Sequence, residues 1–352
     1  MTLVVKWRPG RGLGVALVAL IFSALAACDS GREIHTLSGP TMGTSWSVKV
    51  VGLPAGVSRA QLQSDIELFL ESLNNQMSTW EEDSALSGYN QADAETWYPV
   101  PPDLYKVVDF ALKVAGDTDG AYDPTVGPLV NLWGFGPGHD DFKRPSDEAI
   151  RDTRARTGWR KLELKPEEGA VLQPGGVYLD LSSVAKGFAV DKVADFLRAR
   201  GVEAFLVEIG GELRALGEKP GGRPWRVAVE KPQSGPSRQV EQVLPLRDKS
   251  MATSGDYRNF HQVDGERYSH TIDPRTGRPV EHRVASVTVL ASNCMKADAL
   301  ATALNVMGPE EGMAFARDRN LAVLMLIRTD DGGFREMTTE QFLRLREEQK
   351  AS

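Results

Sequence analysis

The order of strand-like and helix-like segments limits the fold of this chain most strongly. Alternating residues over Ser45–Val51 predict a strand, and a capping box at Ser58 and Gln61 predicts the start of a helix that continues to Met77. Further helices are predicted from Ser146 onward and over Pro102–Val114, Phe188–Arg200, Met295–Met307 and Thr339–Glu348. Further strands are predicted over Val177–Leu181, Ala204–Ile209, Trp225–Val229, Val284–Ala291 and Leu321–Arg328. This order indicates an α+β fold, with mixed or antiparallel sheets and flanking helices.

The N-terminus has the composition of an export signal. Residues 1–13 carry Lys6, Arg8 and Arg11, and the uncharged apolar segment 14–27 follows them. Because a permanent membrane helix needs ~20 apolar residues, residues 1–27 predict a cleaved signal peptide. The segment ends in Leu-Ala-Ala-Cys, which is similar to a bacterial lipobox, where cleavage leaves a lipid on Cys28. The alternative is an ordinary signal peptide followed by a chance cysteine.

A lipid on Cys28 predicts the location of the protein. The chain is then exported and anchored to the bacterial membrane, its domain faces the periplasm, and residues 28–38 are a short tether. The chain holds two cysteines, so acylation of Cys28 leaves Cys294 without a disulfide partner. We therefore expect Cys294 to be a small buried apolar residue.

The net charge excludes one broad class of function. The formal charge is −7, and it becomes −10 when residues 1–27 are removed, because they hold three basic and no acidic residues. General nucleic-acid binders owe their phosphate affinity to clustered Lys and Arg. We therefore expect no nucleic-acid partner, and an anionic ligand would need a locally basic or metal-bridged pocket.

Asp298 and Thr302 form a candidate cation site. They are four residues apart, so their side chains share one face of the helix predicted over Met295–Met307. A carboxylate and a hydroxyl suit a hard cation such as Mg2+. In the alternative, the carboxylate is solvated and the threonine bonds to a carbonyl of its own helix. Spacing alone favours this alternative.

Lys186 and His270 are further candidates. Lys186 lies where a helix begins, so its ammonium and the free N–H groups there could bind an anion, although a Walker A motif is absent. The alternative is a surface lysine. His270 is a candidate general base, and a hydrogen-bonded structural histidine is the alternative. The five histidines form no HExxH motif and no close pair, so zinc is not expected.

Clusters rich in Gly, Ser, Thr and Asp lie between the predicted elements, and each of them alone is typical of a turn. Taken together and in order, they resemble the ApbE family of FAD:protein FMN transferases. The resemblance covers nearly the whole chain after the signal, and its segments are GPTMGT (39–44), MSTW (77–80), DSALSGYN (83–90), GAYDPTVGPLVNLWGFG (120–136), YLDLSSVAKGFAVD (178–191), EIGGELRA (208–215), TSGDYRN (253–259), SHTIDPRTGRP (269–279) and ADALATAL (297–304). It implies an ApbE-like fold related to the T-fold, with one catalytic domain over residues 39–350.

The resemblance also implies an activity and its site. Family members use FAD and Mg2+, transfer FMN to a Thr or Ser hydroxyl of a client flavoprotein and release AMP. The clients carry the acceptor motif Asp-x-x-[Ser/Thr]-Gly-Ala-[Ser/Thr]. Carried over by position, the flavin and nucleotide contacts are Met42, Trp80, Ala121, Tyr122, Asp123, Asp180, Lys186 and Ile272. The implied metal ligands are Ser183, through its carbonyl, with Asp298 and Thr302.

Two questions stay open in the sequence. Our hypothesis is that His270, or a nearby carboxylate such as Asp273, accepts the proton of the client hydroxyl. The alternative activities are an Mg2+-dependent FAD pyrophosphatase, which would give FMN and AMP, and a flavin-binding lipoprotein without catalysis.

Overall fold

A computed structural model of the chain describes residues 33–136, 142, 144–232, 240–255, 260–263 and 265–351, with side chains up to residue 348. The predicted signal peptide and Cys28 lie outside these residues. Among the helices within the described ranges, none is both long and apolar enough to cross a bilayer.

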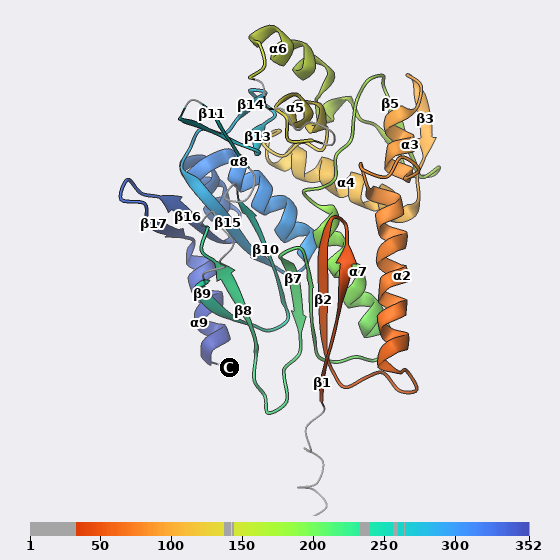
Figure 1. Ribbon diagram of the computed structural model, residues 1–352, viewed down its shortest axis with the longest axis vertical. Coiled ribbons are helices and arrows are strands. Elements are labelled where there is room, and N and C mark those ends of the chain that lie inside the picture. Colours follow the sequence, from red (N-terminus) through yellow and green to blue (C-terminus); the bar gives the residue numbers. More distant parts are fainter. Residues whose placement is uncertain are drawn as a thin grey trace, which may run out of the picture.

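An eight-stranded sheet forms the centre of the molecule (Figure 1). All neighbouring strands in it are antiparallel, so the α+β class is confirmed and the sheet is not mixed. Its strands, in spatial order, are β1 (Ile34–Thr41), β2 (Thr44–Val51), β6 (Phe205–Ile209), β7 (Glu212–Leu216), β10 (Lys249–Gly255), β15 (Val284–Ala291), β16 (Ala322–Arg328) and β17 (Phe334–Thr338).

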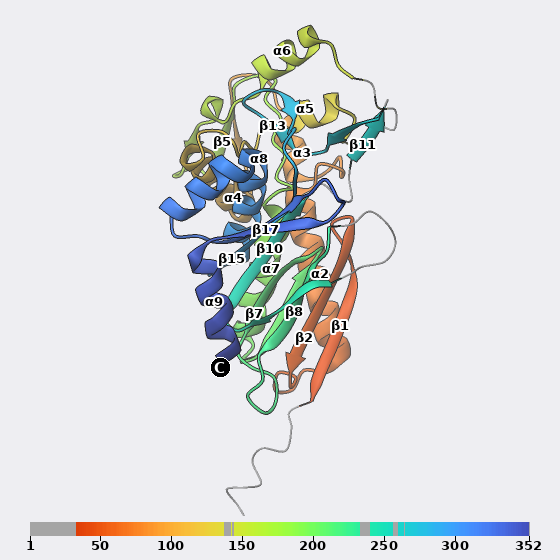
Figure 2. The ribbon, with the colours of Figure 1, turned by 90° about the vertical axis from the view of Figure 1, so that its left-hand side faces the viewer.

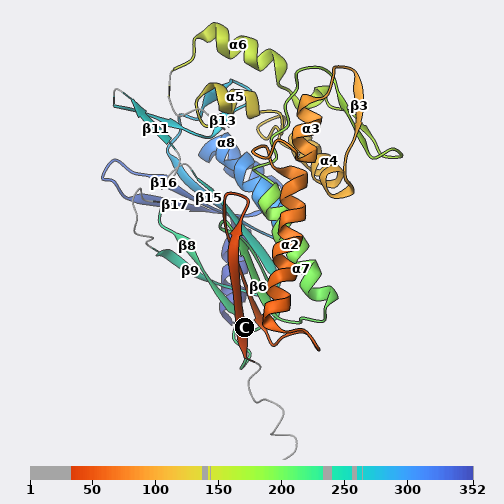
Figure 3. The same cartoon turned by 45° about the vertical axis from the view of Figure 1, so that its right-hand side comes forward.

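The two faces of the sheet are covered differently (Figures 2 and 3). Helices α2 (Arg59–Met77), α7 (Ala185–Ala199) and α8 (Cys294–Asp318) pack on one face, where their apolar stripes meet buried strand residues such as Val48 and Val207. The other face is covered in part by a hairpin of β8 (Trp225–Glu230) and β9 (Val240–Leu246) and by α9 (Glu340–Ala351). The sheet is therefore buried on one side and partly open on the other.

The remaining elements lie mostly beyond the sheet, at the upper end of Figure 1. The helices there are α3 (Ala85–Gln91), α4 (Pro102–Asp117), α5 (Gly127–Leu132), α6 (Asp147–Arg156) and a 3-10 helix (Trp159–Lys161). The short strands are β3 (Thr96–Pro99), β4 (Leu164–Lys165), β5 (Ala170–Gln173), β11 (Phe260–Val263), β12 (Glu266–Ser269), β13 (Ile272–Asp273) and β14 (Arg278–Pro279).

The capping residues in the sequence predict the starts of two helices correctly. The Ser58 hydroxyl accepts a hydrogen bond from the Gln61 N–H at 3.2 Å, as the capping box predicts, and Ser146 caps α6 in the same way. The helix predicted to end at Met307 has non-helical backbone at Gly308, with φ of 78°, and then continues to Asp318. A glycine therefore kinks α8 where the sequence predicts its end.

Two predictions about local structure are wrong. Val177–Leu181 is not a strand, although its residues alternate in burial, because side chains bond its backbone in place of a neighbouring strand. The Asn90 amide bonds both the N–H and the carbonyl of Leu179, and the Gln173 amide does the same for Val177. The tether predicted over residues 28–38 is too long, because Ile34 onward pairs with β2 in the central sheet.

Candidate active site

A cavity of about 860 Å3 is lined by strand residues that face away from the helices, such as Leu206 and Glu208, and by residues near the starts of α7 and α8. This volume falls within the usual range for ligand sites, about 300–1,000 Å3. Of the predicted site residues, those that line it are Ala121, Tyr122, Asp123, Asp180, Ser183, Lys186, His270, Ile272, Asp298 and Thr302. The fold thus brings together ten side chains from sequence segments as distant as residues 121 and 302.

A close crossing of α7 and α8 builds the acidic part of the site. The N–H of Gly187 donates to Oδ2 of Asp298 at 2.9 Å. A Cβ at Gly187 would lie 2.5 Å from the Cys294 carbonyl oxygen and 2.8 Å from the Cβ of Asp298. Only glycine therefore lets the start of α7 approach α8 this closely. Cys294 is fully buried at the crossing, which confirms the prediction for it.

Asp298 is a buried carboxylate with one oxygen still available. The residue is 5% exposed, and burial raises its pKa to about 8, while Lys186 opposes the rise and Glu212 adds to it. Its Oδ1 forms no hydrogen bond with the residues that the structure describes. The hydroxyl of Thr302, one turn later on α8, likewise bonds to no described residue, so the carbonyl bond of the alternative interpretation is absent.

Lys186 is held beside these oxygens by a residue that the sequence did not single out. Its Nζ lies 3.3 Å from Oε1 of Glu212, whose side chain is only 6% exposed. Burial acts against the charged form of Lys186, but Glu212 and Asp298 outweigh it and raise the lysine pKa. The other carboxylate oxygen of Glu212 is buried and has no hydrogen-bond partner among the residues that the structure describes.

The turn between β6 and β7 makes room for this lysine. Gly210 has a φ of 64°, and a Cβ there would lie 3.1 Å from Cδ of Lys186. Glu212 follows it as the first residue of β7. The Gly-Gly-Glu run is the signal from which Glu212 could have been predicted, because paired glycines often mark a close approach to another group.

Tyr122, Asp123 and Ser183 form one wall of the cavity. The Ser183 hydroxyl donates to the Tyr122 hydroxyl at 3.2 Å, and burial raises the pKa of this tyrosine. Asp123 accepts from the Thr125 N–H, the Thr125 hydroxyl and the Trp159 N–H at 2.8, 2.7 and 3.1 Å. These bonds show that the Asp123 carboxylate holds the loop together as well as lining the cavity.

The segment that holds His270 separates the two candidate bases. His270 lines the cavity, whereas Asp273 does not. Both carboxylate oxygens of Asp273 accept from Arg275, with Nε to Oδ1 at 3.0 Å and Nη2 to Oδ2 at 3.1 Å. The geometry therefore favours His270 as the group that faces a substrate. Asn305 of α8 donates to the Thr271 hydroxyl at 3.1 Å and fixes this segment against the helix.

Two predicted contacts lie away from the cavity wall. Trp80 is 71% exposed, and Met42 sits in the turn between β1 and β2 with a φ of 46°. Neither residue lines the cavity. The flavin or nucleotide contacts of Met42 and Trp80 stay predictions, because neither side chain lies at the cavity in this structure.

Within the described ranges, no three His, Cys, Asp or Glu side chains converge on a common point. A site made of one carboxylate, one hydroxyl and a backbone carbonyl is of the kind that Mg2+ accepts, since it keeps several other ligands.

The comparisons with known proteins agree with this geometry. The profile of the ApbE family matches residues 42–325, which include every cavity residue named above. The chain belongs to the ApbE family. Among relatives named FAD:protein FMN transferase, one from Vibrio cholerae is 47% identical over 93% of this chain and 97% of its own length. Another, from Haemophilus influenzae, is 43% identical over 91% of this chain and 93% of its own.

Solved ApbE structures share the fold. The flavin transferase ApbE from Vibrio cholerae superposes with a TM-score of 0.81 at 45% identity, covering 89% of this chain and 99% of that protein. The apo form of the flavinyl transferase ApbE from Pseudomonas stutzeri gives 0.82 at 39% identity, covering 90% and 98%. The expected ApbE-like fold is thereby confirmed.

Proposed function

We propose that this chain is an FAD:protein FMN transferase that links FMN to a Thr or Ser hydroxyl of a client flavoprotein and releases AMP. The observation that carries the proposal is the meeting of Asp298, Thr302 and Lys186 in one cavity. A carboxylate–hydroxyl pair beside an ammonium suits a pyrophosphate bound with a divalent cation. The activity in the names of the relatives supports it.

The residues at the α7–α8 crossing fit Mg2+. Asp298 already satisfies one oxygen through the Gly187 N–H, and its second oxygen, like the Thr302 hydroxyl, has no partner among the described residues. Burial disfavours the ionised form of Asp298, and Lys186 offsets this only in part, so the pKa of the carboxyl stays raised and a further cation would stabilise the charge. We assign the carbonyl of Ser183 as the third ligand. Mg2+ bound there would neutralise negative charge on the phosphate oxygens.

Lys186 and His270 have different roles in the transfer of FMN. Lys186, held by Glu212, binds a phosphate oxygen of FAD. His270 accepts the proton of the client hydroxyl while the hydroxyl oxygen forms a bond to the FMN-side phosphorus. The bond from that phosphorus to the bridging oxygen breaks, and AMP leaves with the electron pair. Tyr122 and Ala121 supply wall surface for a flavin or adenine ring.

The location of the protein is part of the proposal. We infer that the chain is exported, that Cys28 carries the lipid and that the domain faces the periplasm, on the strength of the basic and apolar segments before Cys28. Clients with the motif Asp-x-x-[Ser/Thr]-Gly-Ala-[Ser/Thr] would then be exported or membrane-bound flavoprotein subunits.

One incubation tests the activity. The protein is mixed with FAD, Mg2+ and a client fragment that carries the acceptor motif, and the client mass is measured. A gain of one FMN, absent when the acceptor residue is alanine, supports transfer. Free FMN and AMP with an unmodified client would identify a pyrophosphatase instead. Tight FAD binding with neither product would identify a binding protein.

A further inference from the structure

A cluster of unpaired basic side chains lies at one end of this acidic protein. It consists of Lys49 on β2, Lys219 and Arg223 on the β7–β8 turn, and Arg226 on β8, and none of the four forms an ion pair within the described residues. The pKa of Lys219 is lowered, first by burial and then by Arg223, Arg226 and Lys49. The other three charges therefore lie close enough to Lys219 to repel it. Two of them, Lys49 and Arg226, also line the cavity of the candidate active site, whereas Lys219 and Arg223 do not. We call this set the basic end.

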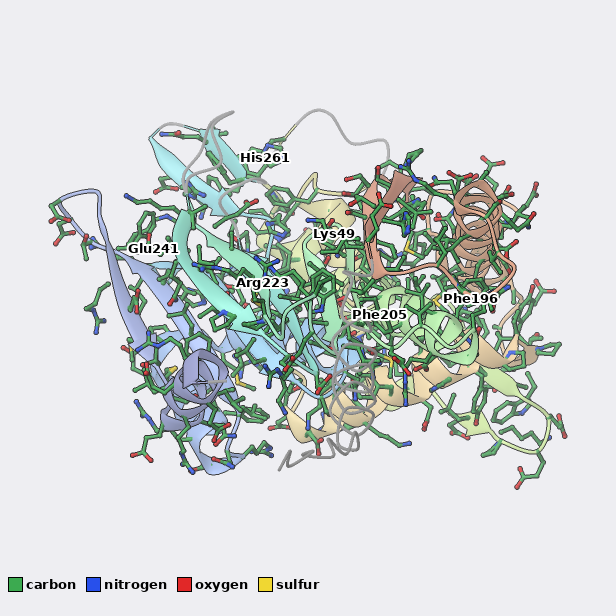
Figure 4. The ribbon with its side chains drawn as sticks, turned by 90° about the horizontal axis from the view of Figure 1, so that it is seen from below. Lys49, Phe196, Phe205, Arg223, Glu241 and His261 are labelled. Atoms are coloured by element: carbon green, nitrogen blue, oxygen red, sulfur yellow. The ribbon has the colours of Figure 1, made fainter. Side chains whose placement is uncertain are left out.

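The basic end lies on the open face of the sheet. In β2, Val48 and Val50 are buried among the helices, so the alternating Lys49 points to the opposite face. Figure 4 looks at this end of the molecule and shows Lys49 and Arg223 near the middle of it. The nearby Glu218 is already paired with Arg247 and does not neutralise the cluster.

The first strand of the fold, β1, begins close to Lys49 of the basic end. Lys49 pairs in register with Thr36, and Ile34 pairs with Val51 at the end of the strand. Only five residue steps separate Glu33 from Cys28. An extended chain spans at most ~3.6 Å per residue, so Cys28 lies within about 18 Å of Glu33. A lipid on Cys28 therefore keeps this end of the molecule at the membrane surface.

We propose that the basic end binds the anionic phospholipid headgroups of the membrane that holds the Cys28 lipid, and so sets the orientation of the enzyme. The inference rests on the anchoring given under the proposed function. Charge complementarity and the tether length support a lipid surface over a soluble partner. Each basic side chain near such a surface strengthens adsorption by about fivefold, provided that it lies within a Debye length. The end of the molecule with α6 would then point away from the bilayer (Figure 1).

The test uses the full-length, lipidated protein in vesicles. A fluorophore is attached at Ala55→Cys, in the exposed loop after β2, or at Glu148→Cys on α6 at the opposite end. Cys294 is fully buried and acylation blocks Cys28, so the added thiol is the reactive one. Quenching by headgroup-labelled lipid is compared between phosphatidylcholine vesicles and vesicles that also contain phosphatidylglycerol.

We expect phosphatidylglycerol to increase quenching at position 55 severalfold and to leave position 148 unchanged. Salt at about 1 M, where the Debye length is ~3 Å, should remove the increase. The variant Lys219→Glu/Arg223→Glu should remove it too, while the control Arg151→Glu/Arg335→Glu, with the same change in net charge, keeps it. Lys219 and Arg223 do not line the cavity, so FAD binding serves as a check on folding.

Other outcomes would overturn the inference. If the protein is attached to both kinds of vesicle and quenching at position 55 is equal in them, the inference is wrong. A rise in the KM for the client in Lys219→Glu/Arg223→Glu, with unchanged quenching, would assign the basic end to client docking. Absence of an acyl group from Cys28 in the mass spectrum, with no vesicle attachment, would defeat the proposed anchoring and the inference that rests on it, and leave the transferase activity untouched.

Discussion

Replacing Asp298 by asparagine is expected to abolish transfer and to stabilise the metal-free protein. Asparagine keeps the size of the side chain and an oxygen for the Gly187 N–H, but it removes the charge. Without metal, burial raises the Asp298 pKa from 3.8 to about 8. Between these values the folded chain binds a proton that the unfolded chain has released, so stability falls as the pH rises. Above pH 8 the folded protein carries the whole cost of a buried charge.

The magnitude follows from the shift. Each pKa unit corresponds to about 1.4 kcal/mol, so four units set an upper limit of roughly 5–6 kcal/mol in the free energy of unfolding. Local relaxation and water entry reduce such penalties, and we expect a gain on the order of 2–4 kcal/mol for Asp298→Asn above pH 8. For a chain of 352 residues this raises Tm by a few degrees, at roughly 1–2 °C per kcal/mol.

Thermal unfolding in EDTA at pH 8.5 and 5.5 measures the effect. We expect Asp298→Asn to melt higher than the wild type at pH 8.5, and the difference to shrink at pH 5.5, where Asp298 is protonated in the folded state. Added Mg2+ should stabilise the wild type alone. A variant that melts below the wild type at pH 8.5, or a gain that does not depend on pH, would refute the burial argument.

Three further substitutions probe the site. Lys186→Met is expected to weaken FAD binding at least tenfold in flavin-fluorescence titrations, because the pyrophosphate loses a charged partner, and an unchanged affinity would contradict this role. His270→Ala is expected to slow transfer by about 10²–10⁴ while FAD affinity stays the same, and transfer at the wild-type rate would remove His270 as the base. Gly187→Ala is expected to cost about 1–3 kcal/mol in urea unfolding, because its Cβ would meet the Cys294 carbonyl at 2.5 Å, and unchanged stability would speak against the close crossing.

Local patterns predicted most elements of the fold. The side-chain cap at Ser58 and the apolar spacing after it are short-range features, so α2 begins and ends close to the prediction. The strand predicted over Val177–Leu181 is wrong, because an alternating pattern shows which side chains are buried but does not show what the backbone groups bond to. The amides of Asn90 and Gln173 supply that partner, and Asn90 lies almost ninety residues from the Leu179 that it binds.

The site was predicted in part, and for a related reason. Family motifs identified Lys186 and Asp298, but motif and spacing carry no information on which side chains pair across the fold. The Lys186–Glu212 contact and the Arg275 bonds that occupy Asp273 are visible only in the structure. The exposure of a side chain also depends on distant parts of the chain. Trp80 therefore matches a family motif and is nevertheless 71% exposed.

The sequence by itself determined the class of the fold, the helix caps, the acidic charge, the signal-like N-terminus and the membership of the ApbE family, because periodicity, composition and motif order are all written along the chain. Only the tertiary structure decided which carboxylate is desolvated, which lysine it meets and which face of the sheet stays open. Those properties depend on burial and on contacts between residues as far apart as Gly187 and Asp298. The basic end likewise exists only because β2 and the β7–β8 turn come together in space.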